Sequence, residues 1–351
     1  MADDRGNHLT AKAAAITDDV IATDYAQRPE LLARFGERGR TLYRRDNLYH
    51  LSFLTEAVRL GEPALFVDYV AWAKSMLSSH GVPVEHLVEN LRLLRTAICR
   101  HVPPDEAAAA AVPIDKSLQA LALPGAEPAT FCASASPHGG LALDYLTLLL
   151  KADRKGAAGL IHRAVGEGLP LQRIYLDVFQ QSQREVGRLW QLNRITVAQE
   201  HYCTAATQAI MNQFFGQVLE TPRIDRRVIA FCVAGDLHEI GLRIVADLFE
   251  LAGWECDFLG ANMPADSIFD MLTAAPPDLI AVSATMTFHL ELVEEFIRTL
   301  RARPDIAHIP VMVGGRPFLI AENLWQRVGA DGWAADAETA VARGSELVDG
   351  R

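Results

Sequence analysis

The stretch 228–241, Val-Ile-Ala-Phe-Cys-Val-Ala-Gly-Asp-Leu-His-Glu-Ile-Gly, joins an apolar run to a short polar turn. The run predicts a buried strand, and the turn falls where a helix should begin, which is where an α/β sheet binds ligands. His238 stands at this strand end, with Asp236 two residues earlier to hold its other ring nitrogen, as in an oriented metal ligand. Gly241 leaves room for a bulky group to approach the backbone.

The residues that follow indicate the fold around this turn. Apolar runs near 228–234, 254–259, 278–283, 310–313 and 331–335 are each followed by a helical stretch. Alternating strands and helices of this kind predict a doubly wound, five-stranded parallel sheet with helices on both faces. Ser283, Thr285 and the pair Gly314-Gly315 follow the third and fourth strands, so they belong to the same edge of the sheet as His238.

The part of the chain before this sheet is helical in period. We predict an N-terminal helical domain over 1–101, a linker rich in proline, alanine and small polar residues over 102–138, and a four-helix bundle over 139–220. The sheet domain then spans 226–351. The fold class is therefore multidomain, with two helical parts followed by an α/β part.

Composition bounds the function classes. The 351 residues carry a net charge of −11, which argues against an electrostatic grip on nucleic acid. The five cysteines show neither metal-type spacing nor a disulfide framework, and no apolar stretch is long enough to span a membrane. Because the N-terminus also lacks the apolar segment of a signal peptide, we expect a cytoplasmic protein that binds neither nucleic acid nor membranes.

The motif Asp-x-His-x-x-Gly at 236–241, with Ser283-Ala284-Thr285 and Gly314-Gly315, resembles the cobalamin-binding domain of methionine synthase and its relatives. The resemblance covers about residues 140 to 348 and implies a flavodoxin-like strand order. It also implies that His238 replaces the cofactor's own base as the lower ligand to cobalt, that the two glycines line the slot for the nucleotide tail, and that the strand-end Ser283 bonds either the Asp-His pair or that tail. The cofactor-binding residues it implies in this part are Asp236, Leu237, His238, Ile240, Gly241, Ser283, Thr285, Gly314, Gly315 and Arg316. Without this context, His238 would be a surface histidine at a helix start, and the glycine pair a plain turn.

A second pattern consists of Trp190, nine further residues and then Glu200-His201. It lies in the predicted bundle, which by the same resemblance would cover the upper face of the corrin. It is similar to the cap of the adenosylcobalamin-dependent photoreceptors, which implies that Trp190 fills space around the adenosyl group while Glu200 and His201 contact it. The alternative is a core tryptophan beside a solvated Glu-His pair. In the related light-dependent repressors a histidine follows the tryptophan and ligates cobalt after illumination, but here that residue is Gln191.

The N-terminal block contains Tyr43-Arg44-Arg45-Asp46-Asn47-Leu48-Tyr49-His50 on one predicted helix and Phe66, Tyr69, Trp72 and His80 on the next. Aromatic residues at helical spacing are usually core residues. A helical block joined to a photoreceptor-type cobalamin domain nevertheless resembles the photocobilins, which carry cobalamin and biliverdin. That resemblance implies arginines for the propionates and Asp46 or His50 for the pyrrole nitrogens. Cys99 is the only thiol of the block, so we expect non-covalent attachment.

Two functions follow from these resemblances. The first is a light sensor in which photolysis of adenosylcobalamin changes domain packing or the state of a homo-oligomer that an unknown effector protein reads. The second is a corrinoid methyl carrier for partner methyltransferases. Neither gives this chain catalytic residues of its own, so we expect a sensor or carrier rather than an enzyme.

Overall fold

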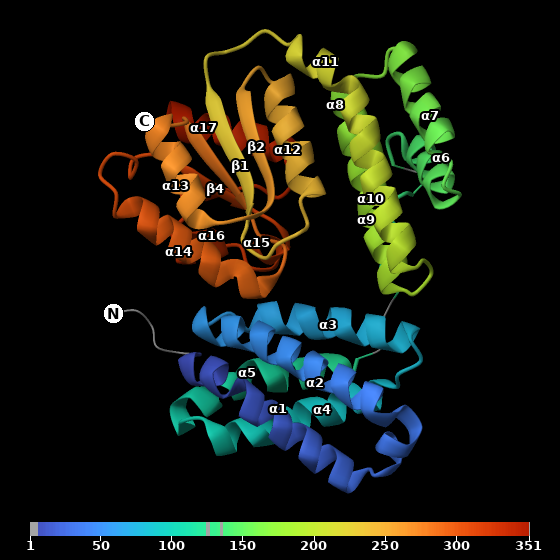
Figure 1. The fold of residues 1–351 in the computed structure, drawn as a ribbon, viewed down its shortest axis with the longest axis vertical. Helices are drawn as coiled ribbons and strands as arrows, with labels where there is room; N and C mark the ends of the chain where they lie inside the picture. The colour runs from blue at the N-terminus through green and yellow to red at the C-terminus, as the bar shows by residue number, and fades with distance from the viewer. Residues whose placement is uncertain (1–5, 124–126, 134–135, 351) are drawn as a thin grey trace. The chain divides into compact units, whose positions relative to one another are not determined.

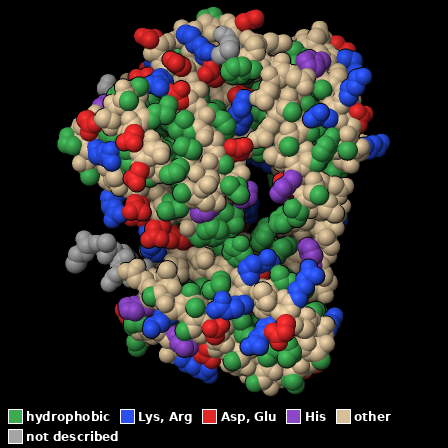
Figure 2. Space-filling view, in the orientation of Figure 1, with side chains coloured by type: hydrophobic (Ala, Val, Ile, Leu, Met, Phe, Trp, Pro, Cys, Tyr) green, Lys and Arg blue, Asp and Glu red, His purple; other side chains and the backbone are tan. Residues whose placement is uncertain are grey.

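The computed structural model describes residues 6–123, 127–133 and 136–350, and the chain divides into two compact units, Met1–Glu127 and Pro128–Arg351 (Figure 1). The described part contains no helix long and apolar enough to cross a lipid bilayer. Acidic and basic side chains intermingle over the face shown in Figure 2.

The first unit consists of helices α1 Asn7–Gln27, α2 Glu30–Arg59, α3 Pro63–Ser79, α4 Val84–His101 and α5 Pro104–Leu121. Its middle connections are short because Gly61 and Gly81 adopt positive φ angles of 60° and 75°, which end the preceding helices, and Pro63 then opens α3 at a position that needs no N–H donor. The helical N-terminal domain is therefore as the sequence predicts.

The predicted linker 102–138 is wrong over much of its length, because α5 lies within it. Its proline residues misled the prediction: Pro104 begins the helix, where proline is tolerated, and the alanine run that follows is a strong helix former. One face of α5 is buried in the core of the first unit through Ala110 and Ile114. The buried Glu106 also accepts a hydrogen bond from the Leu9 backbone N–H at 2.8 Å. The helix α5 is therefore part of the first unit and does not act as a linker.

Aromatic packing joins α2 to α3. The rings of Phe53 and Tyr69 stack with centroids 3.8 Å apart and planes 12° apart, and Trp72 lies 6.2 Å from Tyr69. His50 is buried, and its Nδ1 lies 2.8 Å from the Tyr69 hydroxyl. Because burial disfavours the charged imidazolium, the pKa of His50 falls to about 4. The core interpretation of the aromatic residues named from the sequence therefore holds for Phe66, Tyr69 and His50, whereas Tyr49 of α2 is exposed.

The second unit begins with the bundle. Its helices are α6 Gly139–Leu150, α7 Arg154–Gly166, the continuous run of α8 Leu171–Arg173, the π-helix η1 Ile174–Phe179 and α9 Gln180–Gln191, and then α10 Val197–Met211. The short η2 Asn212–Phe214 and α11 Phe215–Leu219 lead to the sheet. Thr196 and Gln199 form a capping box that fixes the first turn of α10.

The sheet contains strands β1 Arg227–Val233, β2 Glu255–Met263, β3 Leu279–Ser283, β4 Val311–Gly314 and β5 Gly332–Trp333. They are parallel and lie in the order β2-β1-β3-β4-β5, which is the flavodoxin-like order. The predicted five-stranded doubly wound sheet is thereby confirmed. Between the strands lie α12 Ile240–Leu251, α13 Ala265–Ala274, η3 Thr287–His289 with α14 Leu290–Arg301, and α15 Arg316–Ile320 with α16 Leu324–Arg327, and α17 Ala337–Asp349 ends the described chain.

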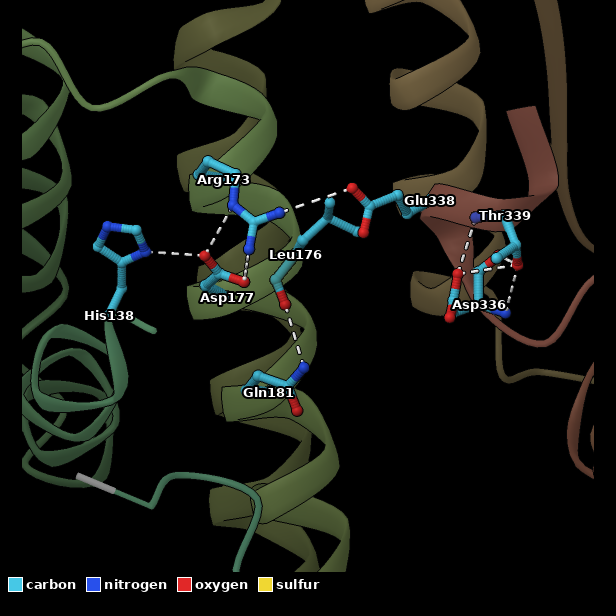
Figure 3. Close-up of polar contacts among 8 residues, drawn as sticks. All are labelled: His138, Arg173, Leu176, Asp177, Gln181, Asp336, Glu338 and Thr339. Atoms are coloured by element: carbon cyan, nitrogen blue, oxygen red, sulfur yellow. Dashed lines mark hydrogen bonds and ion pairs between the residues drawn. The ribbon is translucent and has the colours of Figure 1, made fainter. Parts of the chain in front are cut away.

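The bundle and the sheet share one core. Ile244 and Leu248 of α12 and Ala337 of α17 are buried in the same apolar cluster as the bundle helices. Buried polar contacts cross the same boundary, since the Tyr175 hydroxyl donates to Asp247 at 2.8 Å. In Figure 3, Arg173 of α8 reaches Asp177 of η1 on one side, at 2.7 Å, and Glu338 of α17 on the other, at 3.6 Å.

Candidate functional site

The turn after β1 holds Asp236 and His238 in a fixed relation. Gly235 has a φ of 80°, which turns the chain at the carboxyl end of the strand. The Asp236 carboxylate is fully buried; its Oδ1 accepts hydrogen bonds from the His238 backbone N–H at 3.0 Å and from His238 Nδ1 at 2.8 Å, and its Oδ2 accepts one from the Thr285 N–H at 2.5 Å. The His238 side chain is 59% exposed, so its other nitrogen, Nε2, is available to a ligand.

The electrostatics of the pair match this geometry. Burial alone would raise the pKa of the Asp236 carboxyl, but the hydrogen bonds from His238, the nearby imidazole of His289 and the Thr285 N–H outweigh burial and hold that pKa far below its ordinary value. The hydrogen bond to Asp236 in turn raises the pKa of His238, and the negative charge of Glu200 adds to the effect. The carboxylate therefore stays ionised and makes the imidazole a more basic ligand.

His289 is a part of this site that sequence reasoning missed. It comes from η3, after β3, and its buried Nδ1 lies 3.7 Å from Asp236 Oδ2. Ser283, which the resemblance pairs with Asp236 or with the nucleotide tail, makes no hydrogen bond to Asp236; its hydroxyl lies beside the Cys232 thiol instead. The sequence signal for His289 was weak, because a single histidine in a loop after a strand has many structural uses.

The two glycines at the end of β4, Gly314 and Gly315, differ in how closely other backbone atoms approach them. Gly315 has a φ of 114°, and a Cβ there would lie 2.1 Å from the Ala284 carbonyl oxygen, so the two loops pass each other in van der Waals contact. A Cβ on Gly314 would meet only the Ala334 carbonyl oxygen, at 3.8 Å. At Gly241 a Cβ would meet nothing within 4 Å, in keeping with the predicted open approach beside His238.

The remaining predicted residues lie at the rim of this edge. Leu237 is 73% exposed, Arg316 is exposed and begins α15, and Ile240 begins α12. Thr285 contributes its backbone N–H to Asp236 rather than its hydroxyl. These positions all follow the carboxyl ends of β1, β3 and β4.

The predicted cap residues occupy the ends of α9 and α10. Trp190 is half-buried and packs against the bundle core, while Glu200 and His201 lie in the first turn of α10 and are bonded to each other. Glu200 faces the sheet edge closely enough for its charge to act on His238. The His201 side chain is 76% exposed, and Thr204 donates to the other oxygen of Glu200 at 3.3 Å.

Comparison with known proteins agrees with this geometry. Residues 226–342 match the model of a B12 binding domain, residues 141–214 match a second B12 binding domain model, and residues 4–121 match the model of a phycobilisome protein. The solved structure of the monomethylamine corrinoid protein of Methanosarcina barkeri has the same fold over 60% of this chain and 100% of its own, with a TM-score of 0.54 and 19% identity.

Among curated relatives, dimethylamine corrinoid protein 3 of Methanosarcina acetivorans is 34% identical over 117 residues, which are 33% of this chain and 54% of that protein. The protein of the same name from Methanosarcina mazei is 32% identical over 117 residues, which are 68% of its length. The chain thus spans about half the length of most of the curated relatives that it matches most strongly.

Fold and site together define a protein that binds a corrinoid at the carboxyl edge of a doubly wound sheet. The chain belongs to the family of B12-binding corrinoid proteins. Its residues fit cobalamin: Asp236 fixes one nitrogen of an exposed imidazole and leaves the other for a metal, and a Cβ at the nearby Gly241 would meet nothing within 4 Å, which leaves room for a bulky group.

Proposed function

We propose that this protein is a cobalamin-dependent light sensor with a linear tetrapyrrole as second chromophore in the unit Met1–Glu127. The observation that carries the proposal is the match of residues 4–121 to the model of a phycobilisome protein. A cobalamin domain joined to such a unit is the arrangement of the photocobilins, which the sequence resembles.

At the sheet edge, His238 would be the lower axial ligand to cobalt. Asp236 accepts the Nδ1 proton and thereby selects the tautomer whose Nε2 lone pair faces outward. Gly314 and Gly315 would line the slot for the nucleotide tail, with Ser283 toward its inner end. Leu237, Ile240, Gly241, Thr285 and Arg316 would border the corrin.

On the opposite face, Trp190, Glu200 and His201 would surround the upper ligand. The capping box of α10 fixes the turn that carries Glu200 and His201, and the closeness of Glu200 to His238 supports a place over the corrin. When bound, adenosylcobalamin supplies a cobalt–carbon bond that light breaks. The chain's own part is to hold the adenosyl group, release it, and let the bundle shift against the sheet.

In the first unit, the contacts narrow the candidates for a bilin site. Arg44 is paired with Asp18 at 3.0 Å, and His50 is buried against Tyr69, so His50 is no longer a candidate for the pyrrole nitrogens. Asp46 remains: it faces Tyr69, and partial burial raises its pKa. We propose that its carboxylate receives the pyrrole N–H groups, while the exposed Tyr49 offers a ring face. Arg45, whose Nε lies 3.8 Å from Asp46 Oδ1, would exchange this loose ion pair for a propionate.

An absorption spectrum of the full chain loaded with adenosylcobalamin, recorded before and after green light, tests the sensor. Illumination should convert the spectrum to that of a cobalamin without its adenosyl group and should change the elution volume in gel filtration. A photolysed cofactor with no change in elution or in domain packing would reject the sensor and leave a light-sensitive carrier.

A second candidate is a corrinoid methyl carrier for partner methyltransferases, and the curated relatives favour it, because they are named dimethylamine corrinoid proteins. A methyl group needs only a small apolar cover. Trp190→Ala separates the two functions: a sensor should lose preference for adenosylcobalamin by about 1 to 3 kcal/mol while binding methylcobalamin as before. Equal losses for both cofactors would favour the carrier.

A further inference from the structure

The hydrogen bonds of Asp236 leave one acceptor site open. A carboxylate offers about four lone-pair positions. The described structure occupies three of them: the His238 backbone N–H and His238 Nδ1 at Oδ1, and the Thr285 N–H at Oδ2. The fourth position belongs to Oδ2, which lies 3.7 Å from His289 Nδ1.

His289 matches this vacancy. Its Nδ1 is buried and has no hydrogen-bond partner among the residues that the structure describes, and leaving such a group unsatisfied is costly. The ring is held from two sides: the Phe288 ring lies edge-on with centroids 4.6 Å apart, and a Cβ at Gly235 would come within 3.2 Å of His289 Nε2. A shift of about 0.5 Å from the present 3.7 Å would bring Nδ1 within hydrogen-bonding distance of Oδ2.

We propose that His289 is a positioning residue for the lower ligand. Its Nδ1–H donates to Asp236 Oδ2, fixes the plane of the carboxylate and so keeps Oδ1 aligned with His238 Nδ1. Ser283 does not take this part, because it makes no hydrogen bond to Asp236 and lies beside Cys232 instead. The Asp236 carboxylate would thus accept hydrogen bonds from two imidazoles, that of His238, which faces the cofactor, and that of His289, which is buried in the protein. The inference rests on the proposed ligation of cobalt by His238.

Two substitutions separate positioning from packing. His289→Phe keeps a ring of similar size but removes the donor, whereas His289→Asn returns an N–H near the position of Nδ1. Ser283→Ala is the matched control at the residue that sequence reasoning had favoured. Circular dichroism and thermal melts establish that each variant is folded.

The first readout needs no cofactor. Long-range proton–nitrogen correlation spectra of the apo protein report which ring nitrogen of His238 carries the proton. We expect the Nδ1–H tautomer in the unmodified protein, in Ser283→Ala and in His289→Asn, and a mixture of tautomers in His289→Phe. A pure Nδ1–H tautomer in folded His289→Phe would overturn the inference. If His289→Phe does not fold, a mixture of tautomers in folded His289→Asn would overturn it.

The second readout is electron paramagnetic resonance of the cobalt(II) form. His289→Phe should lower the ratio of imidazole-bound to imidazole-free cobalt roughly tenfold, and His289→Asn should restore most of it. His238→Ala tests the ligand assignment separately from the role of His289. If nitrogen splitting survives in His238→Ala, His238 is not the ligand. Splitting that is lost in His238→Ala but undiminished in His289→Phe leaves the ligand assignment intact and rejects only the role of His289.

Discussion

At the scale of single residues, the proposed ligation depends on one exposed imidazole and one buried carboxylate. His238→Ala removes the proposed lower ligand, so cobalamin should bind weakly and in a form without an axial imidazole. Asp236→Asn keeps the imidazole but loosens it, and should cost about tenfold in affinity. Titration of cobalamin monitored by absorption measures both. If His238→Ala binds as tightly as the unmodified protein and with the same spectrum, the ligand lies elsewhere.

The glycine pair offers an internally controlled test. Gly315→Ala forces a side chain into a positive-φ position and against the Ala284 carbonyl, so we expect it to destabilise the second unit by about 3 kcal/mol. Gly314→Ala meets only an ordinary contact and should cost less than about 1 kcal/mol. Denaturant unfolding of the two variants measures the difference, and equal costs would contradict the geometry described here.

At the scale of elements, the packing of α2 on α3 should make the first unit sensitive to acid. The pKa of His50 is about 4 in the folded chain, below the ordinary value of 6.5, so the unfolded chain binds a proton first as pH falls. Stability is therefore full above about pH 6.5, declines between pH 6.5 and 4, and levels off below, with a total loss of about 3 kcal/mol. Hydrogen exchange of α2 and α3 at pH 7.5 and pH 5 should show somewhat more than half of this loss, about 2 kcal/mol, because pH 5 is still above the folded pKa.

His50→Gln is the control for that titration. Glutamine has no charge in this range and can still bond the Tyr69 hydroxyl, so the variant should lose less protection on acidification than the unmodified protein. An identical loss in both would assign the acid sensitivity to other groups of the unit.

An element could be predicted from the sequence when the residues that determine it are close to one another along the chain. The parallel sheet and the position of His238 follow from strand-length apolar runs and a turn next to them, which a single sequence displays. The helix α5 was missed because its prolines resemble a linker, whereas burial of Ala110 and Ile114 depends on partners far along the chain. The π-helical turn at Ile174–Phe179 was missed because it differs from an α-helix only in hydrogen-bond register.

The site shows the same division. Asp236 and His238 are two residues apart and carry a recognisable pattern, so the sequence indicated them together. His289 lies 51 positions beyond His238 and reaches Asp236 only because β3 pairs with β1 in parallel. Contacts made by sheet pairing across such a separation leave no periodic trace in a single sequence.

At the scale of the whole molecule, the first unit should bind biliverdin. Full-length protein incubated with biliverdin should acquire red absorption that survives gel filtration, because the ring faces of Tyr49 and Trp72 and the Asp46 carboxylate suit a flat, N–H-bearing chromophore. Asp46→Ala should weaken the absorption, while Asp18→Ala, which removes a carboxylate of α1 that is paired with Arg44, serves as the control.

Biliverdin that elutes only with small molecules would leave the first unit as a dimerisation or signal-relay module. The same experiment on residues 128–351 should yield no red absorption, since the second unit has no part in the proposed bilin site. Red absorption retained by residues 128–351 would place the pigment elsewhere.

The core that α12 and α17 share with the bundle limits how the cofactor can enter. Lifting the bundle as a hinged lid would expose the faces of Leu248 and Tyr175 to water, and the Tyr175–Asp247 bond would break with them. Small sliding movements of packed helices avoid that exposure. Loading of cobalamin should then be slow and steeply dependent on temperature, with a rate set by partial melting of the bundle rather than by diffusion to an open edge.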